Sequence, residues 1–386
     1  MKLFITAGEP SGDALGAALI AGLKALRPGM ELRGVAGPQM QAAGMESLFP
    51  MEELSVMGIA EVLPKYFALK RRIRETADAA LAWRPDAILT IDSPDFSLRV
   101  AKQVKAASEI PTLHYVAPTV WAWRPGRAAR MAPIVDHVLA LFPFEPPYMT
   151  AHGMTCDFVG HPIVARAPVS EEASRAFRTR HGLGDSRALV LLPGSRAGEV
   201  ERLIPIFAEA IGRSALRDWP VILPTLPHIA PRVRALSERL PTRPLLLTGE
   251  GMGASDAAEE RRVAMAAANL ALAASGTVSL ELAAAGTPMV IAYDMNWLTR
   301  SYVNARLLTD TVTLVNLVSE TRAVPEFIGR ACRAEAIAPA LDALAHDTTT
   351  QDAAMALTMA RLGQGGEAPG LRAARSVLER LDLGAA

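Results

Sequence analysis

Short apolar segments alternate with helical segments along most of this chain. A first series runs from KLFITA to CDFVGHPI, and a second begins at RALVLLPG and runs to TPMVIAY. Short apolar strands separated by helices are typical of parallel sheets buried on both faces. The composition changes near residues 162–185, between the two series. We therefore expect an α/β protein with two Rossmann-like domains whose parallel sheets face each other across a cleft.

This break gives an expected first domain at residues 1–165 and a second at 166–354. The Ala-rich tail is typical of closing helices, and we expect residues 355–386 to pack back on the first domain. In open parallel sheets, ligands bind beyond the carboxyl ends of the strands. The loops that follow the strands are therefore the places to look for site residues.

Charge and composition exclude several classes of protein. The chain has 40 Lys and Arg against 40 Asp and Glu, whereas nucleic-acid-binding proteins usually carry a basic excess. Its two cysteines fit no disulfide framework, and its seven histidines show no metal-ligand spacing. No apolar run reaches the ~18 residues of a membrane span. The sequence begins directly with a strand rather than a signal peptide, so we expect a cytoplasmic enzyme.

The turn after the first strand, AGEPSGDALG, lies where a dinucleotide-binding protein carries its fingerprint. That fingerprint is G-x-G-x-x-G, whereas the glycines here are four residues apart. The turn also contains Glu9 and Asp13, and carboxylates would repel a phosphate at a helix N-terminus. We expect these acids to meet sugar hydroxyls or a transferable proton. The alternative is that Ser11 or Asp13 only caps the first helix.

Two strand-to-helix turns in the second half predict phosphate binding. LLPGSRAGEV places Ser195 and Arg196 at a helix start, where free N–H groups and the helix dipole favour an anion. The guanidinium of Arg196 also fits a phosphate bidentately. Glu199 either belongs to this site or is a capping-box partner of Ser195 or Arg196.

The second of these turns, ASGTVSLE, again joins a strand to a helix. Ser275, Gly276 and Thr277 bring small hydrogen-bond donors, and the carboxylate of Glu281 can accept bonds from a ribose. An ordinary strand–turn–helix connection is the alternative for each turn. Together the two turns predict that the second domain binds a nucleoside diphosphate.

Candidates for chemistry follow two apolar strands of the first half. Asp92 and Asp95 come after AILTI, and His114 lies at the end of TLHY. Asp95 is a candidate general base in apolar surroundings, or only the N-cap of a helix that begins near Phe96. His114 is either structural or catalytic.

Three arginines, Arg124, Arg127 and Arg130, recur every three residues and share a helix face. They form either a solvated face or a positive surface for an anionic acceptor.

Several long motifs occur in order along nearly the whole chain. They are GEPSGD, GVAGPQM, EELSVMGIAEVL, IDSPDF, HYVAPTVWAWR, FPFE, VGHP, LLPGSRAGEV and ASGTVSLELAAAGTPMV. On these motifs the chain resembles the lipid-A-disaccharide synthases, inverting glycosyltransferases of the lipid A pathway. The resemblance implies the GT-B architecture of two Rossmann-like domains. It also implies β-1,6 transfer from UDP-2,3-diacylglucosamine to 2,3-diacylglucosamine 1-phosphate, with release of UDP.

The resemblance further implies roles for particular residues. It puts the general base at Asp95, with His114 as the competitor, and places Glu9 and Asp13 beside the acceptor sugar. No D-x-D metal motif occurs, so Arg196 and the helix starts are expected to neutralise the leaving group, without a metal or cofactor. The residues expected to bind UDP are Ser195, Arg196, Glu199, Ser275, Gly276, Thr277, Glu281 and Asn316.

Acylated substrates imply contact with a membrane. The stretch SVMGIAEVLPKYFALKRRIR joins apolar residues to a basic cluster, which suits peripheral docking on the anionic inner face of the inner membrane. From the residues alone, a buried core helix with a solvated end is the alternative. The residues expected to contact membrane or acyl chains are Met57, Ile59, Val62, Leu63, Tyr66 and Phe67.

Two other functions share this architecture and these nucleotide loops. One is a UDP-sugar 2-epimerase, and the other is a non-catalytic module that binds nucleotide sugars. A homodimer is suggested only by the family resemblance.

Overall fold

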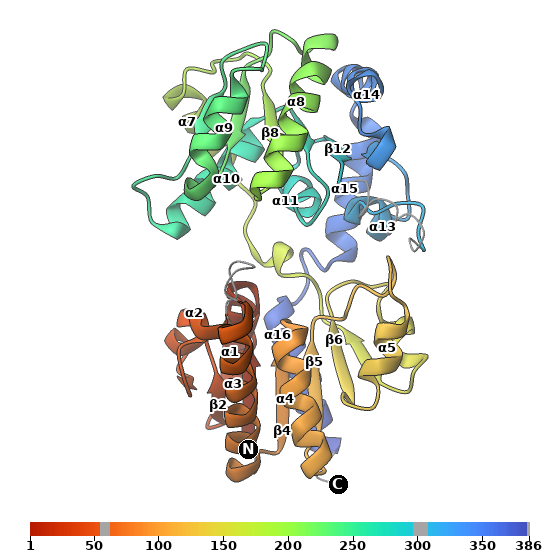
Figure 1. Ribbon diagram of the computed structural model, residues 1–386. Helices are drawn as coiled ribbons and strands as arrows, with labels where there is room; N and C mark the ends of the chain where they lie inside the picture. Colours follow the sequence, from red (N-terminus) through yellow and green to blue (C-terminus); the bar gives the residue numbers. More distant parts are fainter. Residues whose placement is uncertain (55–61, 296–307, 384–386) are drawn as a thin grey trace. The chain divides into compact units, whose positions relative to one another are not determined.

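The computed structural model describes residues 1–54, 62–295 and 308–383, apart from the side chains of residues 62–66 and 383. The chain divides into two compact units, each an α/β structure (Figure 1). Unit 1 comprises residues 1–165 and 362–386, and unit 2 comprises residues 166–361. The chain therefore leaves unit 1, forms unit 2 and returns to unit 1.

The described part of unit 1 contains a seven-stranded sheet in which every neighbouring pair is parallel. In spatial order its strands are β3 (Glu46–Ser47), β2 (Glu31–Val35), β1 (Lys2–Ala7), β4 (Ala87–Ile91), β5 (Thr112–Tyr115), β6 (His137–Ala140) and β7 (Thr155–Phe158). β1, β4, β5 and β6 are apolar and almost wholly buried, as expected of central parallel strands. The predicted parallel sheet is confirmed.

Helices cover the sheet of unit 1. They are α1 (Pro10–Leu26), α2 (Pro38–Ala42), α3 (Val62–Trp83), α4 (Pro94–Ala107), α5 (Gly126–Met131), α6 (Pro146–Thr150) and α16 (Pro369–Leu383). Phe96, Val100 and Val104 lie on one face of α4 and pack with Ile73 of α3 and Ile88 of β4 in one apolar cluster. This packing fixes the start of α4, where Asp95 lies.

Unit 2 repeats the plan with a six-stranded parallel sheet in its described part. Its strands in spatial order are β10 (Leu245–Leu247), β9 (Val221–Pro224), β8 (Leu189–Leu192), β11 (Leu270–Ala273), β12 (Met289–Tyr293) and β13 (Glu326–Ile328). Its helices are α7 (Glu171–Arg180), α8 (Ala197–Arg213), α9 (Ala230–Ser237), α10 (Ala254–Ala267), α11 (Val278–Ala285), α13 (Leu314–Ser319), α14 (Ala334–His346) and α15 (Thr349–Arg361). β8 and β11 are neighbours, so the two predicted phosphate-binding turns leave adjacent strands.

The returning helix α16 is built into unit 1. In Figure 1 it carries the blue of the chain's end among the red and orange elements of the beginning. α16 packs against α1 so closely that a Cβ on Gly22 would lie 2.6 Å from the carbonyl oxygen of Gly370. His137 of β6 is buried between Thr155 Oγ1 at 2.8 Å and Ser376 Oγ at 2.9 Å. α16 thus supplies both helix packing and a buried polar contact.

Asn316, in α13, has a structural position. It is fully buried, its Nδ2 donates to the carbonyl of Val324 at 2.9 Å, and its Oδ1 accepts from the amide of Val324 at 2.9 Å. Nδ2 also lies 3.3 Å from Thr311 Oγ1. Contrary to the sequence expectation that Asn316 binds UDP, its amide group is used to hold residues 311–324 together.

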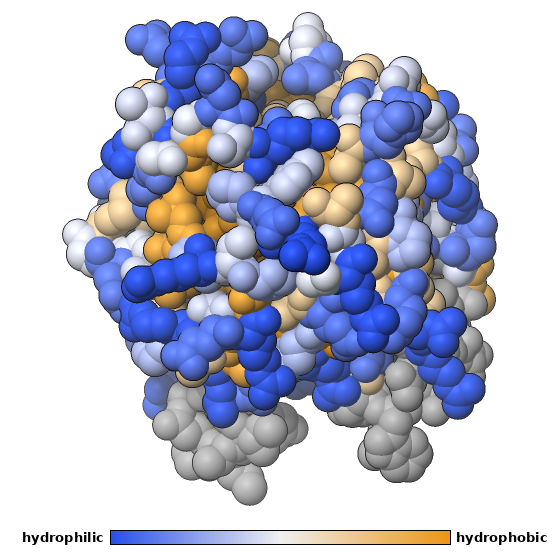
Figure 2. Space-filling model, turned by 90° about the horizontal axis from the view of Figure 1, so that it is seen from above, coloured by the Kyte–Doolittle hydropathy of each residue, from blue (hydrophilic) through white to orange (hydrophobic). Residues whose placement is uncertain are grey.

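The apolar residues lie mostly in the two cores. Hydrophilic residues occupy most of the face shown in Figure 2, and hydrophobic ones appear between them in smaller areas. Among the described helices, none is both long and apolar enough to cross a membrane.

Candidate functional site

The parallel register of unit 1 brings three loops to one edge of its sheet. Thr6 of β1 pairs with Thr90 of β4, and Thr90 pairs with His114 of β5. The loops that follow these strands begin two residues after these positions, with Gly8, Asp92 and Val116. Side chains far apart in the sequence therefore meet at this edge.

The first two of these loops are in close contact. A Cβ on Gly8 would lie 2.6 Å from Ser93 Oγ, so a larger residue at position 8 would require Ser93 to move. Glu9 is the exposed N-cap residue of α1, and no hydrogen bond from its side chain caps the helix. Partial burial, and then the negative charge of Asp92, raise the pKa of Glu9. Glu9 thus lies close enough to Asp92 to be affected by its charge, but it does not line the cavity that opens at the ends of β4 and β5.

Asp13 does not face this space. It is 1% exposed, and its two oxygens accept hydrogen bonds from the backbone N–H groups of Gln39 at 2.8 Å and Met40 at 2.9 Å. A Cβ on Gly37 would lie 2.5 Å from Asp13 Cγ. The expectation that Asp13 meets the acceptor sugar is wrong, because its carboxylate caps α2 instead. The idea that it caps α1 is wrong too.

A cavity of about 490 Å³ opens at the ends of β4 and β5. Its polar wall groups are two carboxylates, one imidazole, three guanidiniums and one hydroxyl, beside several apolar side chains. The lining residues are Asp92, Pro94, Asp95, Leu98, His114, Val116, Ala117, Pro118, Thr119, Arg124, Arg127, Arg130, Met131 and Ile134. The structure thus brings Asp92, Asp95 and His114 to one cavity, as expected of strand ends.

Asp95 lies in the first turn of α4, which begins at Pro94 rather than near Phe96. The N-cap residue is Ser93, so Asp95 is not the helix cap. Its side chain is 91% exposed, and its nearest cation is Arg99, with Nη2 3.6 Å from Oδ1. Asp95 is thus surrounded by solvent rather than by the apolar groups expected, and it is accessible to a substrate.

His114 is buried at the wall of the same cavity and is 3% exposed. Burial lowers the pKa of His114 to about 4, so the ring is neutral at physiological pH. Its Nδ1 lies 2.7 Å from Thr90 Oγ1, which in turn donates to the carbonyl of Leu113 at 3.2 Å. A neutral imidazole has one ring nitrogen without a proton, so His114 can act as a base.

Backbone strain is concentrated around this cavity. Asp92, Ser93 and Arg124 have φ values of 47°, 45° and 58°, and the β-branched Val116 has a φ of 86°. Left-handed conformations cost non-glycine residues on the order of 1–3 kcal/mol each and persist where surrounding structure enforces them. Three of these four residues line the cavity, which points to a functional site.

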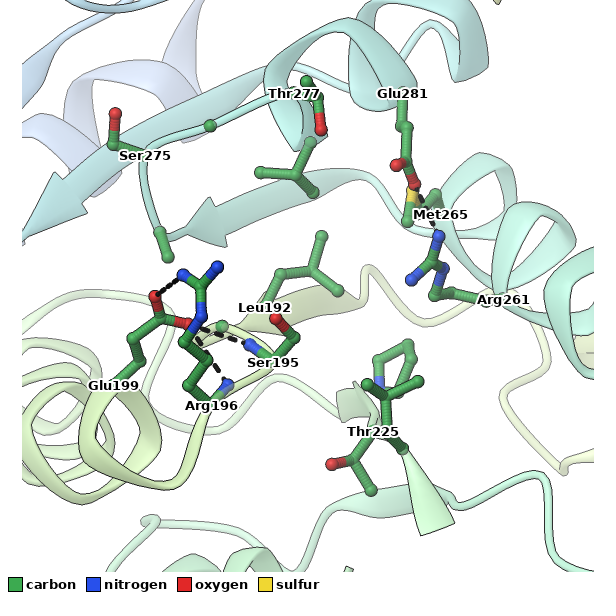
Figure 3. Close-up of a pocket in the computed structure, with 16 residues that line it drawn as sticks. Leu192, Ser195, Arg196, Glu199, Thr225, Arg261, Met265, Ser275, Thr277 and Glu281 are labelled. Atoms are coloured by element: carbon green, nitrogen blue, oxygen red, sulfur yellow. Dashed lines mark hydrogen bonds and ion pairs between the residues drawn. The ribbon is translucent and has the colours of Figure 1, made fainter. Parts of the chain in front are cut away.

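A second cavity, of about 380 Å³, lies within unit 2 (Figure 3). It is formed by the loops after β8, β9 and β11 together with α10. The lining residues are Leu192, Gly194, Ser195, Arg196, Glu199, Pro224, Thr225, Leu226, Arg261, Met265, Ala274, Ser275, Gly276, Thr277, Val278 and Glu281. Seven of the eight residues expected to bind UDP therefore lie together, and Asn316 does not.

Glu199 forms the capping box at the start of α8. Its Oε2 accepts from the backbone N–H of Ser195 at 3.0 Å and of Arg196 at 3.2 Å. Its Oε1 accepts from Arg196 Nη1 at 3.0 Å and from the Tyr293 hydroxyl at 3.2 Å. Glu199 is thus the capping-box partner of Arg196, and it also lines the cavity. Two amides expected to bind phosphate are already bound, while the Arg196 side chain is 81% exposed.

The other wall of this cavity carries the second turn. Gly276 has a φ of 148°, a conformation that only glycine adopts readily, and it leads through Thr277 into α11. Glu281 Oε2 accepts from Arg261 Nη2 at 3.0 Å, so its carboxylate is held by a cation from α10 (Figure 3). Thr225 Oγ1 is buried without a hydrogen-bond partner among the described residues. Such an atom at a cavity wall is a candidate ligand contact.

The residues expected at the membrane are only partly described. Met57 and Ile59 lie outside the described residues, as do the side chains of Val62, Leu63 and Tyr66 in α3. Phe67 is 66% exposed, whereas Ile73, further along α3, is buried in the core.

Sequence reasoning missed Thr90, Thr225 and Arg261. Thr90 and Thr225 lie at the ends of apolar strands, and this position in the sequence could have marked both as candidate site residues. Arg261 comes from the middle of α10, and nothing local marks it as a wall of the cavity. No cluster of three or more potential metal ligands occurs among the described side chains.

Solved structures with the same fold cover nearly the whole chain. UDP-GlcNAc 2-epimerase from Neisseria meningitidis, bound to UDP-GlcNAc, has a TM-score of 0.63 and 13% identity, covering 99% of this chain and 100% of its own. A glycosyltransferase from Rickettsia africae ESF-5 has a TM-score of 0.58 and 12% identity, and the match covers 100% of this chain and 98% of that one. At such identity the likeness shows the fold alone.

Sequence comparisons are more specific. The family model described as Lipid-A-disaccharide synthetase matches residues 3–370. The lipid-A-disaccharide synthase of Ruegeria pomeroyi is 60% identical over 383 residues, covering 99% of this chain and 96% of that protein. The enzyme of that name from Rhodospirillum centenum is 42% identical over 386 residues, and the match covers 98% of this chain and 94% of that protein. The chain therefore belongs to the lipid-A-disaccharide synthase family.

Proposed function

We propose that the protein joins UDP-2,3-diacylglucosamine to 2,3-diacylglucosamine 1-phosphate through a β-1,6 link, giving lipid A disaccharide 1-phosphate and UDP. The observation that carries the proposal is that each unit has its own cavity at the carboxyl ends of a parallel sheet. One cavity offers groups that suit a nucleoside diphosphate, and the other offers acid–base groups. Family membership supplies the reaction that needs both.

The donor nucleotide belongs to the cavity of unit 2. Arg196 is 81% exposed, and its ion pair with Glu199 is of the kind worth ~0–1 kcal/mol. A charge-assisted hydrogen bond to phosphate is worth ~1.5–3 kcal/mol. Exchange of the ion pair with Glu199 for a contact with the diphosphate therefore lowers the free energy. The positive charge of Arg196 then stabilises the departing UDP without a metal ion. The Ser275–Thr277 turn and the unpartnered Thr225 hydroxyl provide further contacts.

The acceptor belongs to the cavity of unit 1, where Asp95 is the proposed general base. Its exposed carboxylate is accessible to the acceptor 6-hydroxyl, and its ion pair with Arg99 is long and solvated. Removal of that proton lets the oxygen attack the anomeric carbon from the side opposite UDP, which inverts the configuration. Asp92 and Ser93 adopt left-handed backbone conformations, which give the loop before Asp95 a defined shape. His114 is the competing base.

We further propose that the protein attaches peripherally to the anionic inner face of the inner membrane through the region around α3. The exposed ring of Phe67 supports this, together with the exposed cations of Arg71 and Arg74 one and two turns later. Such a surface binds by inserting apolar side chains and by attraction to acidic headgroups.

The first prediction concerns the reaction. Incubation with UDP-2,3-diacylglucosamine and 2,3-diacylglucosamine 1-phosphate in EDTA is expected to yield one disaccharide for each UDP released, measured by mass spectrometry. A UDP-sugar 2-epimerase would instead change the donor without the acceptor, and a binding module would change neither. Either result would refute the transferase.

The second concerns the donor site. Arg196→Ala is expected to weaken UDP binding about 10- to 100-fold by calorimetry, because a charge-assisted contact is lost. Arg217→Ala is the matched control, since this exposed arginine of unit 2 lies outside the cavity. Equal UDP affinity in both variants would remove Arg196 from the site.

The third concerns the base. Asp95→Asn keeps the shape of the side chain but not its basicity, so turnover should fall about 10²–10⁴-fold with UDP affinity unchanged. Asp92→Asn should lower turnover by a smaller factor.

The competing base is tested with His114→Ala and with pH. Burial lowers the pKa of His114 to about 4, so His114 is already neutral at about pH 6. Protonation of His114 therefore does not lower the turnover rate at any pH above about 6. Near-normal turnover in Asp95→Asn with none in His114→Ala would transfer the role to His114.

The fourth concerns the membrane. Joint replacement of Met57, Leu63 and Phe67 by Ser should release the protein from anionic vesicles in co-sedimentation, with its melting temperature retained. Leu48→Ser, at another exposed apolar residue of unit 1, should not. If the triple variant still sediments, α3 is not the docking surface.

A further inference from the structure

Three arginines of unit 1 form no ion pair within the described structure. Arg124, Arg127 and Arg130 line the unit 1 cavity, and none of them forms an ion pair with a described carboxylate. Elsewhere in unit 1, arginines such as Arg27 and Arg72 are paired with acids. Guanidiniums that are not paired with acids and share one cavity suit a phosphate, which each can bind bidentately.

Trp123 holds two of these guanidiniums in place. The Cζ of Arg124 lies 4.1 Å from the ring centroid and that of Arg127 lies 5.9 Å from it. Stacking on an aromatic ring restricts the long side chain without using its N–H donors. Arg124 also has a left-handed backbone, with a φ of 58°, although it is not glycine. Strain of this kind is kept where a side chain must point in one direction.

The charges of the cavity are divided between its walls. Asp92 and Asp95 come from the end of β4 and the first turn of α4, whereas the arginines come from the loop after β5 and from α5. A phosphate is attracted to the arginines and repelled by the carboxylates. A ligand with a phosphate at one end and a hydroxyl at the other is therefore bound in one orientation, with the hydroxyl toward Asp95.

Apolar side chains complete the wall beside the arginines. Leu98, Met131 and Ile134 line the same cavity. Its volume of about 490 Å³ suits a phosphorylated sugar with only the first part of an acyl chain. The cavity thus combines phosphate, hydroxyl and apolar recognition in one place.

We propose that Arg124, Arg127 and Arg130 form the binding site for the phosphate monoester of a glycolipid acceptor, and so select phosphorylated over unphosphorylated acceptors. This rests on the proposed function, because it takes the acceptor to be 2,3-diacylglucosamine 1-phosphate. The arginines position the acceptor by its phosphate, while Asp95 receives the proton at the other end.

The test measures binding rather than turnover. Calorimetry in the absence of donor compares short-chain 2,3-diacylglucosamine 1-phosphate with the same glycolipid lacking the phosphate. The parent is expected to bind the phosphorylated form about 10- to 100-fold more tightly. In the joint variant Arg127→Gln with Arg130→Gln, that preference should fall to within a few-fold, with UDP affinity unchanged.

A matched control shows whether the effect is specific to the cavity, and a single substitution serves if the joint variant does not fold. Arg33→Gln removes an exposed arginine of β2 that packs on Trp83, outside the cavity, and should keep the full preference. If the joint variant does not fold, Arg130→Gln alone removes an exposed guanidinium and should reduce the preference in part. A parent without preference, or a folded variant that keeps it, overturns the proposal.

Disaccharide formation is scored separately. If the parent forms no disaccharide but prefers the phosphorylated glycolipid in an arginine-dependent way, the phosphate site stands and the proposed transfer fails. If it forms disaccharide and the variants keep the preference, the transfer stands and the phosphate site fails.

Discussion

The parallel hydrogen-bond ladder from β1 through β4 to β5 is the constraint on which the unit 1 cavity depends. It sets Thr6, Thr90 and His114 side by side, so the three strands end at one level. A slip of one residue would turn His114 to the other face of the sheet. The equivalent ladder between β8 and β11 aligns Leu192 with Ala273 and brings together the two turns that are predicted to bind phosphate.

Two carboxylates of this chain serve the fold at helix starts. Asp13 neutralises the first N–H groups of α2, and Glu199 does the same at α8. A helix start carries unsatisfied N–H groups and a partial positive charge, so an acid placed there is stabilising. Such an acid looks like a ligand group in the sequence. Only the fold shows that its oxygens are already used.

The sequence was sufficient for the parallel sheets, because apolar strands separated by helices form a local pattern. It was also sufficient to place Asp92, Asp95 and His114 at one edge, since parallel strands share their carboxyl ends. The roles of Asp13 and Asn316 could not be predicted, because their partners lie at Gln39, Met40 and Val324 and are set by tertiary packing. The contribution of Arg261 is hidden for the same reason, since it arrives from a different helix.

The return of α16 has a consequence for the order in which the protein is completed. Ribosomes release a chain from its N-terminus, and domains generally fold as units as they emerge. Unit 2 is contiguous, so all of its residues are available once Arg361 has been made. Unit 1 begins first but finishes last. Until residues 369–383 emerge, α1 lacks the helix that packs at Gly22, and His137 lacks Ser376. Nascent unit 1 therefore lacks its covering helix along α1 throughout the synthesis of unit 2.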